Sequence, residues 1–248
     1  ELGGRYNNFN KYGDVFTFSF NPSYNINKKI RVFANISSGF KAPSLYQVYS
    51  EYRHQPATEE LKPEKSMSFE AGVQYAKENV NLRAVYFSRN ITDNIVFYSQ
   101  NVPPYSSYYI NADKQKDKGL ELEARVNFGK VELNANYTNL DGYIETTNAG
   151  KDTSFFNLYR RPRQAINLGL GIQLMKNWYL STNVQSISKR YEPGVTPIEM
   201  PSYYTWNLYS QYSIGKLAKI FVDLKNITDE KYFEVRGYNS RRFNVMAG

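Results

Sequence analysis

Residues 164–174 read Gln-Ala-Ile-Asn-Leu-Gly-Leu-Gly-Ile-Gln-Leu, and the side chains alternate in character. The even positions from 166 to 174 are all Ile or Leu, whereas the odd positions between them are small or polar. Successive side chains of a β-strand point to opposite faces of the sheet. The stretch therefore predicts a strand with one apolar and one polar face.

The same period of two recurs along the chain. Apolar residues alternate with charged, amide, hydroxyl or glycine residues in segments 66–75, 120–128, 131–138 and 203–211. We therefore expect an all-β protein. Alternation alone fits either a soluble sandwich or a transmembrane β-barrel, because both architectures keep one face of each strand away from water.

The connections between these segments alternate between short and long. Short turns are expected at 25–29, 76–79, 128–130, 175–177 and 214–217, and longer loops at 40–65, 101–108, 142–161, 190–202 and 234–241. With this alternation all the long loops emerge at one end of the sheet, as in outer-membrane barrels. We count about twelve strands, in an antiparallel up-and-down arrangement.

Aromatic residues are unusually abundant. The 248 residues include Tyr 23, Phe 15 and Trp 2, or 16% of the chain, although the mean hydropathy is only −0.61. Many of these rings fall where strands meet loops, as Tyr108, Tyr179 and Trp206 do. Rings with a polar tip are favourable at the headgroup level of a membrane, which favours the barrel over an aromatic-rich soluble sheet.

The composition also excludes several kinds of chemistry. The chain has no Cys and a single His, His54, which removes thiol nucleophiles, disulfides, Cys-based zinc sites and nearly all His-centred catalysis. The formal net charge is +8, but the basic residues are scattered rather than gathered in a block. We therefore expect no enzyme, no cofactor, no metal site and no nucleic-acid partner.

An ordered set of motifs covers nearly the whole chain. The motifs are Ser38-Gly39-Phe40-Lys41-Ala42-Pro43-Ser44-Leu45-Tyr46, Leu61-Lys62-Pro63-Glu64, Lys118-Gly119-Leu120-Glu121, Arg160-Arg161-Pro162-Arg163, Asn226-Ile227-Thr228-Asp229-Glu230-Lys231-Tyr232, and Arg236-Gly237-Tyr238 before Arg242-Phe243. Each motif is weak by itself, but together and in this order they specifically resemble the barrel of TonB-dependent outer-membrane receptors.

This resemblance implies a barrel of about 22 strands with a plugged lumen. The chain, residues 1–248, then corresponds to the C-terminal part of the barrel, and the plug domain, the TonB coupling box and the N-terminal barrel strands are expected to be absent from it. Asn239-Ser240-Arg241 departs from the usual Pro-Gly-containing turn of the family. Within the family, segment 109–121 together with Arg161-Pro162 is most similar to vitamin B12 (cobalamin) receptors, with ferric siderophore receptors as the alternative.

The resemblance also suggests where the sites lie. Glu70 and Glu121 are expected on the polar, plug-facing side of neighbouring strands, where they would pair with plug arginines; the alternative is that they are solvated lumen carboxylates. Extracellular loops over a rigid barrel would bind the ligand with rings, amides and a few charges. The candidates are Tyr46, Tyr49, Tyr52, Arg53, Tyr105, Tyr108, Phe155, Phe156, Tyr191, Arg236 and Tyr238.

The resemblance implies active transport of a scarce extracellular small molecule across the outer membrane, driven by TonB and the proton gradient. The implied partners are TonB, through the absent plug and coupling box, the lipid bilayer with its lipopolysaccharide, and a surface lipoprotein. Three rival interpretations are a passive porin-like barrel, a soluble β-rich binding module and, more distantly, catalysis by a loop carboxylate pair.

Overall fold

The computed structural model describes residues 1–51, 60–99, 107–148, 151–156, 159–192 and 198–248. Nearly all of its regular structure is one large antiparallel sheet of 14 strands. Twelve of them follow each other in the order β1-β2-β4-β5-β6-β7-β8-β10-β11-β14-β15-β16, while β3 pairs with β4 and β9 with β8. The expected all-β fold of about twelve consecutive strands is confirmed.

In the first half of the chain the strands lengthen from β4, with 12 residues, to β7, with 22 residues. They are β1 (Leu2–Phe9), β2 (Gly13–Phe20), β3 (Ser23–Asn25), β4 (Ile30–Lys41), β5 (Glu64–Lys77), β6 (Val80–Ser99), β7 (Ser107–Phe128) and β8 (Val131–Asn148). The one helix in the described residues is the short α1 (Leu45–Tyr49).

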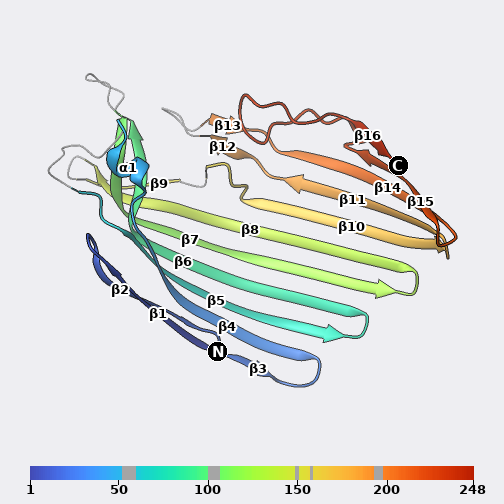
Figure 1. Cartoon of the computed structure of the whole chain (residues 1–248), viewed down its shortest axis with the longest axis horizontal. Helices are drawn as coiled ribbons and strands as arrows, with labels where there is room; N and C mark the ends of the chain where they lie inside the picture. The colour runs from blue at the N-terminus through green and yellow to red at the C-terminus, as the bar shows by residue number, and fades with distance from the viewer. Residues whose placement is uncertain (52–59, 100–106, 149–150, 157–158, 193–197) are drawn as a thin grey trace.

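The second half contains shorter strands and a separate two-stranded sheet. Its strands are β9 (Lys151–Phe156), β10 (Gln164–Met175), β11 (Trp178–Ile187), β12 (Arg190–Glu192), β13 (Ile198–Met200), β14 (Tyr203–Ile214), β15 (Ala218–Lys225) and β16 (Asn244–Ala247). The β12–β13 pair forms the small sheet. Figure 1 shows the main strands side by side in a curved sheet, with β1 and β16 at its two edges.

The two faces of this sheet differ as the alternation predicts. The register pairs Leu168 with Ala135 of β8 and with Val184 of β11, so apolar residues of neighbouring strands share one face. Large apolar side chains on this face remain exposed, with Phe69 at 42% and Leu168 at 48% of their full accessible area. We call this the apolar face, and the opposite one the polar face. Among the described residues, no helix has the length and apolar character needed to span a bilayer.

Apart from the short β1–β2 connection, residues 10–12, which lies at the same end as the long connections, short turns and long connections lie at opposite ends of the strands (Figure 1). All five predicted turns are present, and two of them use a glycine with positive φ, Gly129 at 58° and Gly215 at 58°, a conformation that costs other residues energy. Three predicted loops contain regular structure of their own. Segment 40–65 includes α1, and segment 190–202 includes the separate β12–β13 hairpin. Segment 142–161 includes the end of β8 and β9, because β8 continues beyond its alternating part and pairs with β9.

Candidate functional site

The end of the sheet that carries the long connections holds the predicted ligand-binding residues that the structure describes. We call it the loop end. Helix α1 lies in the connection between β4 and β5, and it begins with a capping box. Ser44 accepts a hydrogen bond from the Gln47 N–H at 3.2 Å, and the Gln47 side chain accepts one from the Ser44 N–H at 2.8 Å. This reciprocal pair satisfies two amide groups that a short helix would leave without partners.

Two predicted tyrosines stand on this helix. Tyr46 is 58% exposed and Tyr49 is 73% exposed. The Tyr46 ring meets the edge of Tyr109 from β7 at a centroid distance of 6.3 Å, and Tyr109 in turn contacts Phe97 of β6 at 5.2 Å. The Tyr46 ring thus contacts Tyr109, whereas the sequence analysis predicted Tyr108, the residue before it in β7, as a ligand-binding residue.

Several predicted residues cannot be placed in this way. Tyr52, Arg53 and Tyr105 lie outside the described residues. Phe155 and Phe156 belong to β9, where their backbones pair with Ile144 and Tyr143 of β8.

A second group of predicted residues gathers around the β12–β13 hairpin. The Tyr191 hydroxyl donates to Glu199 at 3.1 Å, and Lys189 forms an ion pair with the same carboxylate at 3.0 Å. The Glu199 pKa lies below its usual value because Lys189 and Tyr191 both hydrogen-bond to the carboxylate. Tyr191 is therefore held on the hairpin by its own neighbours.

The connection between β15 and β16, residues 226–243, folds against this hairpin through two charged residues that sequence reasoning missed. We call it the last loop. Arg190 is only 5% exposed, and its guanidinium donates to the carbonyl oxygens of Phe233 at 2.5 Å and Glu234 at 3.2 Å. The same guanidinium lies over the ring of Tyr203, 5.0 Å from its centroid. One buried cation thus joins β12, β14 and the last loop.

Glu192 makes the corresponding contacts from the same strand. It is 4% exposed, accepts a hydrogen bond from the Arg236 N–H at 3.1 Å and pairs with Arg160 at 2.8 Å. Burial by itself would raise the Glu192 pKa, but the hydrogen bonds from Arg160 and Arg236, with the nearby positive charges, outweigh it and lower the pKa. Predicted Arg236 is thus fixed through its backbone, and its side chain stays exposed.

A pocket opens between the last loop and the residues that lead from β13 into β14. Its volume is about 440 Å³, and its walls include Ile198, Met200, Tyr203, Tyr232 and Arg236. The rings of Tyr203 and Tyr232 stack at a centroid distance of 4.2 Å. Arg236 and Lys231 line this pocket together with Glu199 and Glu230, so its apolar wall and charges of both signs suit a small organic molecule with polar groups. Predicted Tyr238, 75% exposed, follows in the same loop.

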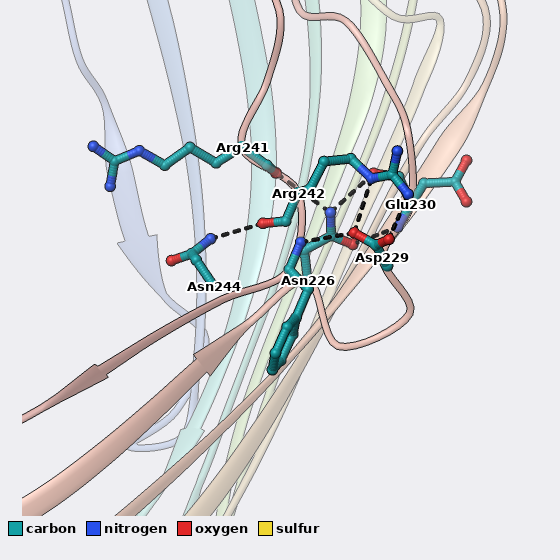
Figure 2. A network of polar contacts seen from close by, with 7 residues as sticks. Asn226, Asp229, Glu230, Arg241, Arg242 and Asn244 are labelled. Carbon is teal, nitrogen blue, oxygen red and sulfur yellow. Dashed lines mark hydrogen bonds and ion pairs between the residues drawn. The ribbon is translucent and has the colours of Figure 1, made fainter.

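The base of the last loop is closed by a polar network that Figure 2 shows from close by. Asp229 accepts hydrogen bonds from both Nε (2.8 Å) and Nη2 of Arg242 and from the Phe243 N–H at 2.9 Å. The Asn226 side chain bonds the Glu230 backbone in both directions, at 2.9 Å each. The motif from Asn226 onward and the later Arg242-Phe243 pair therefore form one structure, which holds the two ends of the loop together.

Glu70 and Glu121 lie on the polar face, as predicted, but not on neighbouring strands. Glu70 is in β5 and Glu121 in β7, and β6 lies between them, with Phe87 opposite Glu70 and Val85 opposite Glu121. The expected adjacency is wrong because β6 separates the two segments. The structure gives neither carboxylate a hydrogen bond or ion pair within the described part of the chain.

A buried polar cluster near the loop end was also missed. Asp117 of β7 is 3% exposed, pairs with Arg89 of β6 at 2.5 Å and accepts bonds from Gln115 at 3.0 Å. Glu64 accepts from the Ile95 N–H at 2.8 Å and pairs with Lys41 at 2.9 Å. Removal of a partner from either buried carboxylate would leave a buried charge unpaired and destabilise this end of the sheet. Within the described residues, no group of three His, Asp or Glu side chains is arranged to hold a metal ion.

Comparison with known proteins gives this geometry a context. A family model described as "TonB dependent receptor-like, beta-barrel" matches residues 1–227. The siderophore receptor PirA from Acinetobacter baumannii is similar in structure, with a TM-score of 0.76 and 17% identity, and the match covers 99% of this chain and 42% of PirA.

Two further solved structures are similar. A mutant of the ferric enterobactin receptor PfeA from Pseudomonas aeruginosa, in complex with enterobactin, has a TM-score of 0.75 and 18% identity over 99% of this chain and 42% of that one. The copper transporter OprC has a TM-score of 0.72 and 16% identity over 89% of this chain and 34% of that one. The chain thus spans about two fifths or less of the length of these structures, and likeness at such identities establishes the fold.

Proposed function

The chain belongs to the TonB-dependent receptor family, in its β-barrel part, and from this we propose that it forms part of an outer-membrane transport receptor. The receptor would bind a scarce small molecule outside the cell and import it without chemical change. TonB would supply the force, drawn from the proton gradient. Membership of this family disfavours the passive pore, the soluble binding module and the enzyme as alternatives.

The observation that carries this proposal is the band of exposed apolar residues on the apolar face. Alternate residues are apolar along segments 67–75, 120–128 and 166–174, each nine residues long. A tilted strand needs about 9–11 residues to cross the hydrocarbon of a bilayer. Exposed side chains such as Phe69, Leu122 and Leu168 would be a liability in water and are stable in lipid.

The open edges of the sheet support a larger barrel in the complete receptor. β1 and β16 are the two ends of the strand order and do not pair with each other. Unpaired backbone groups cost several kcal/mol each in hydrocarbon, so a spanning sheet has to close. We propose that further strands, to about 22 in total, and a plug complete the receptor, and that Glu70 and Glu121 face this plug.

The ligand-binding residues are proposed on the loop end. The pocket beside Arg236, the exposed rings of Tyr46 and Tyr49, and Tyr238 on the last loop supply the apolar walls and cationic groups for capture of a small molecule. Cobalamin is one proposed ligand. A ferric siderophore is the second proposed ligand, because two of the similar solved structures are described as siderophore or ferric enterobactin receptors.

The proposal is tested on the complete receptor. Direct titration with cyanocobalamin and with a panel of ferric siderophores should give tight binding of one ligand. Uptake of that ligand into cells should stop when the proton gradient is collapsed. Uptake that continues without the gradient would identify a passive pore and overturn the proposal of active transport.

A role for Glu70 and Glu121 in holding the plug is tested separately. Substituting both with Gln in the complete receptor keeps their shape and removes their charge. We expect a more mobile plug, measured by hydrogen exchange, and altered uptake. Plug exchange and uptake identical to those of the unmodified receptor would show that the two carboxylates are only solvated.

A further inference from the structure

A row of lysines stands directly beyond the apolar band on the outward side of β7. Lys114, Lys116 and Lys118 occupy alternate positions of this strand, in line with Leu120 and Leu122. The pairing of β7 with β8 is regular from Lys114 to Phe128, so all three lysines keep the face of the apolar residues. On this face of β7, Lys118 directly follows Leu120 toward the loop end, so the side chains change there from apolar to positively charged.

Lys65 of β5 extends this row across the sheet. The register pairs Lys65 with Thr92 of β6 and Thr92 with Lys114 of β7, so the three lie side by side on the apolar face. Two strand spacings separate the two lysine backbones by about 10 Å. We call Lys65, Lys114, Lys116 and Lys118 the lysine patch.

The carboxylates of this face are already paired. Glu145 forms an ion pair with Lys116 at 3.2 Å, and Asp141, opposite Lys118, pairs with Arg163 at 3.2 Å. By contrast, the structure shows no ion pair or hydrogen bond between Lys65, Lys114 or Lys118 and any described residue, and all three are exposed. The patch therefore has an unbalanced positive charge.

The position of the lysine patch relative to the apolar band indicates which ligand it contacts. The apolar band of β7, segment 120–128, is about as long as the hydrocarbon of a bilayer requires, so Lys118 and its neighbours fall at the level of the lipid headgroups. We propose that the lysine patch is a binding site for phosphate-bearing lipids of the outer leaflet. This inference rests on the proposed membrane location and adds to it a specific lipid contact, distinct from capture of the transported ligand.

Site-directed removal of two of the three unpaired lysines tests the patch. The complete receptor is reconstituted in nanodiscs of phosphatidylcholine, and binding of diphosphoryl lipid A is titrated. The variant Lys114→Gln/Lys118→Gln spares the paired lysine, and Lys176→Gln/Lys216→Gln is the matched control, since these two exposed lysines lie in the short turns at the opposite end.

The structure gives a definite expectation for this titration. Each headgroup-level lysine contributes about fivefold to binding of an anionic lipid, so the patch variant should bind diphosphoryl lipid A about 25-fold more weakly while the control binds as the unmodified receptor does. Millimolar inorganic phosphate should not displace the lipid, because the apolar band holds the acyl chains beside the patch.

Other outcomes overturn the proposal in distinguishable ways. Equal binding by the patch and control variants would show that general charge, and not the patch, attracts the lipid. Displacement by inorganic phosphate would identify a phosphate site without a lipid. Failure of the unmodified receptor to enter nanodiscs would overturn the membrane location itself, and the patch with it.

Discussion

Removal of Arg190 is expected to release the last loop from the β12–β13 hairpin. The change Arg190→Met keeps much of the volume of the side chain and deletes its charge and donors. It removes the hydrogen bonds to the carbonyl oxygens of Phe233 and Glu234, and the cation over the ring of Tyr203. Glu192, buried in the same place, loses a nearby positive charge.

The magnitude follows from these contacts. A hydrogen bond to a charged group contributes about 1.5–3 kcal/mol when its partner is buried. Arg190 makes two such bonds and is only 5% exposed. Because the two carbonyl groups bind water again when the loop opens, the full value of both bonds is not lost. We therefore expect the free energy that favours the closed loop to fall by about 3 kcal/mol. This corresponds to a roughly 100-fold larger open population.

Hydrogen exchange in the complete receptor measures this population directly. Protection of backbone amides in segment 230–241 should fall by about two orders of magnitude in Arg190→Met. The control Lys189→Met deletes an adjacent but exposed charge, paired with Glu199, and should change protection by less than about fivefold. Loop protection that is the same in both variants would refute the assignment of Arg190 as the residue that holds the loop.

Three further results are expected. Asp229→Asn should loosen the base of the last loop. Because the bonds from Arg242 and the Phe243 N–H lower the Asp229 pKa, the contribution of Asp229 should be complete above about pH 4 and be lost as the pH falls further; loop protection, corrected for intrinsic exchange, that stays unchanged on acidification would contradict this. Gly119→Ala should lower barrel stability by about 1–3 kcal/mol, since a Cβ would overlap the Asn139 carbonyl and the Phe87 ring. Gly169→Ala, whose added Cβ would lie 3.7 Å from its nearest neighbour, should be neutral in thermal unfolding. Equal unfolding temperatures of the two variants would count against the strand register. Leu170→Arg should cost about 2–4 kcal/mol of stability in a bilayer, and Asn167→Arg, which gives up only the hydrogen bond from Asn183 at 2.6 Å, should cost less; the reverse order would mean that the faces are assigned wrongly.

Strict alternation made much of the fold predictable. Strands such as β10 and the turns at Gly129 and Gly215 follow from local rules, because a period of two and a positive φ are properties of neighbouring residues. Strand β6 was harder to read, since Val85 and Phe87 place apolar side chains on the polar face. The expectation that Glu70 and Glu121 lie on adjacent strands overlooked this strand, although the turn predicted at 76–79 and the loop predicted at 101–108 already imply it.

The site was predictable only in part. The order of short and long loops predicted that Tyr46, Tyr191 and Arg236 lie at the loop end, and the structure has all three there. The contacts of Arg190 could not be anticipated, because its partners are backbone carbonyl groups, which any residue provides. Asp117 could have been found, since it shares the alternation of Glu121, but its partner Arg89 requires knowledge of the register.

The central claim is that the apolar face of this sheet meets lipid and the polar face lines the lumen of a receptor barrel. The chain has no cysteine, so single cysteines can be placed at each position of segment 164–174 in the complete receptor and labelled in membranes. We expect a probe dissolved in the lipid to label the even positions and a water-soluble, membrane-impermeant probe to label the odd ones. Labelling that does not alternate, or that alternates in the opposite phase, would contradict the account.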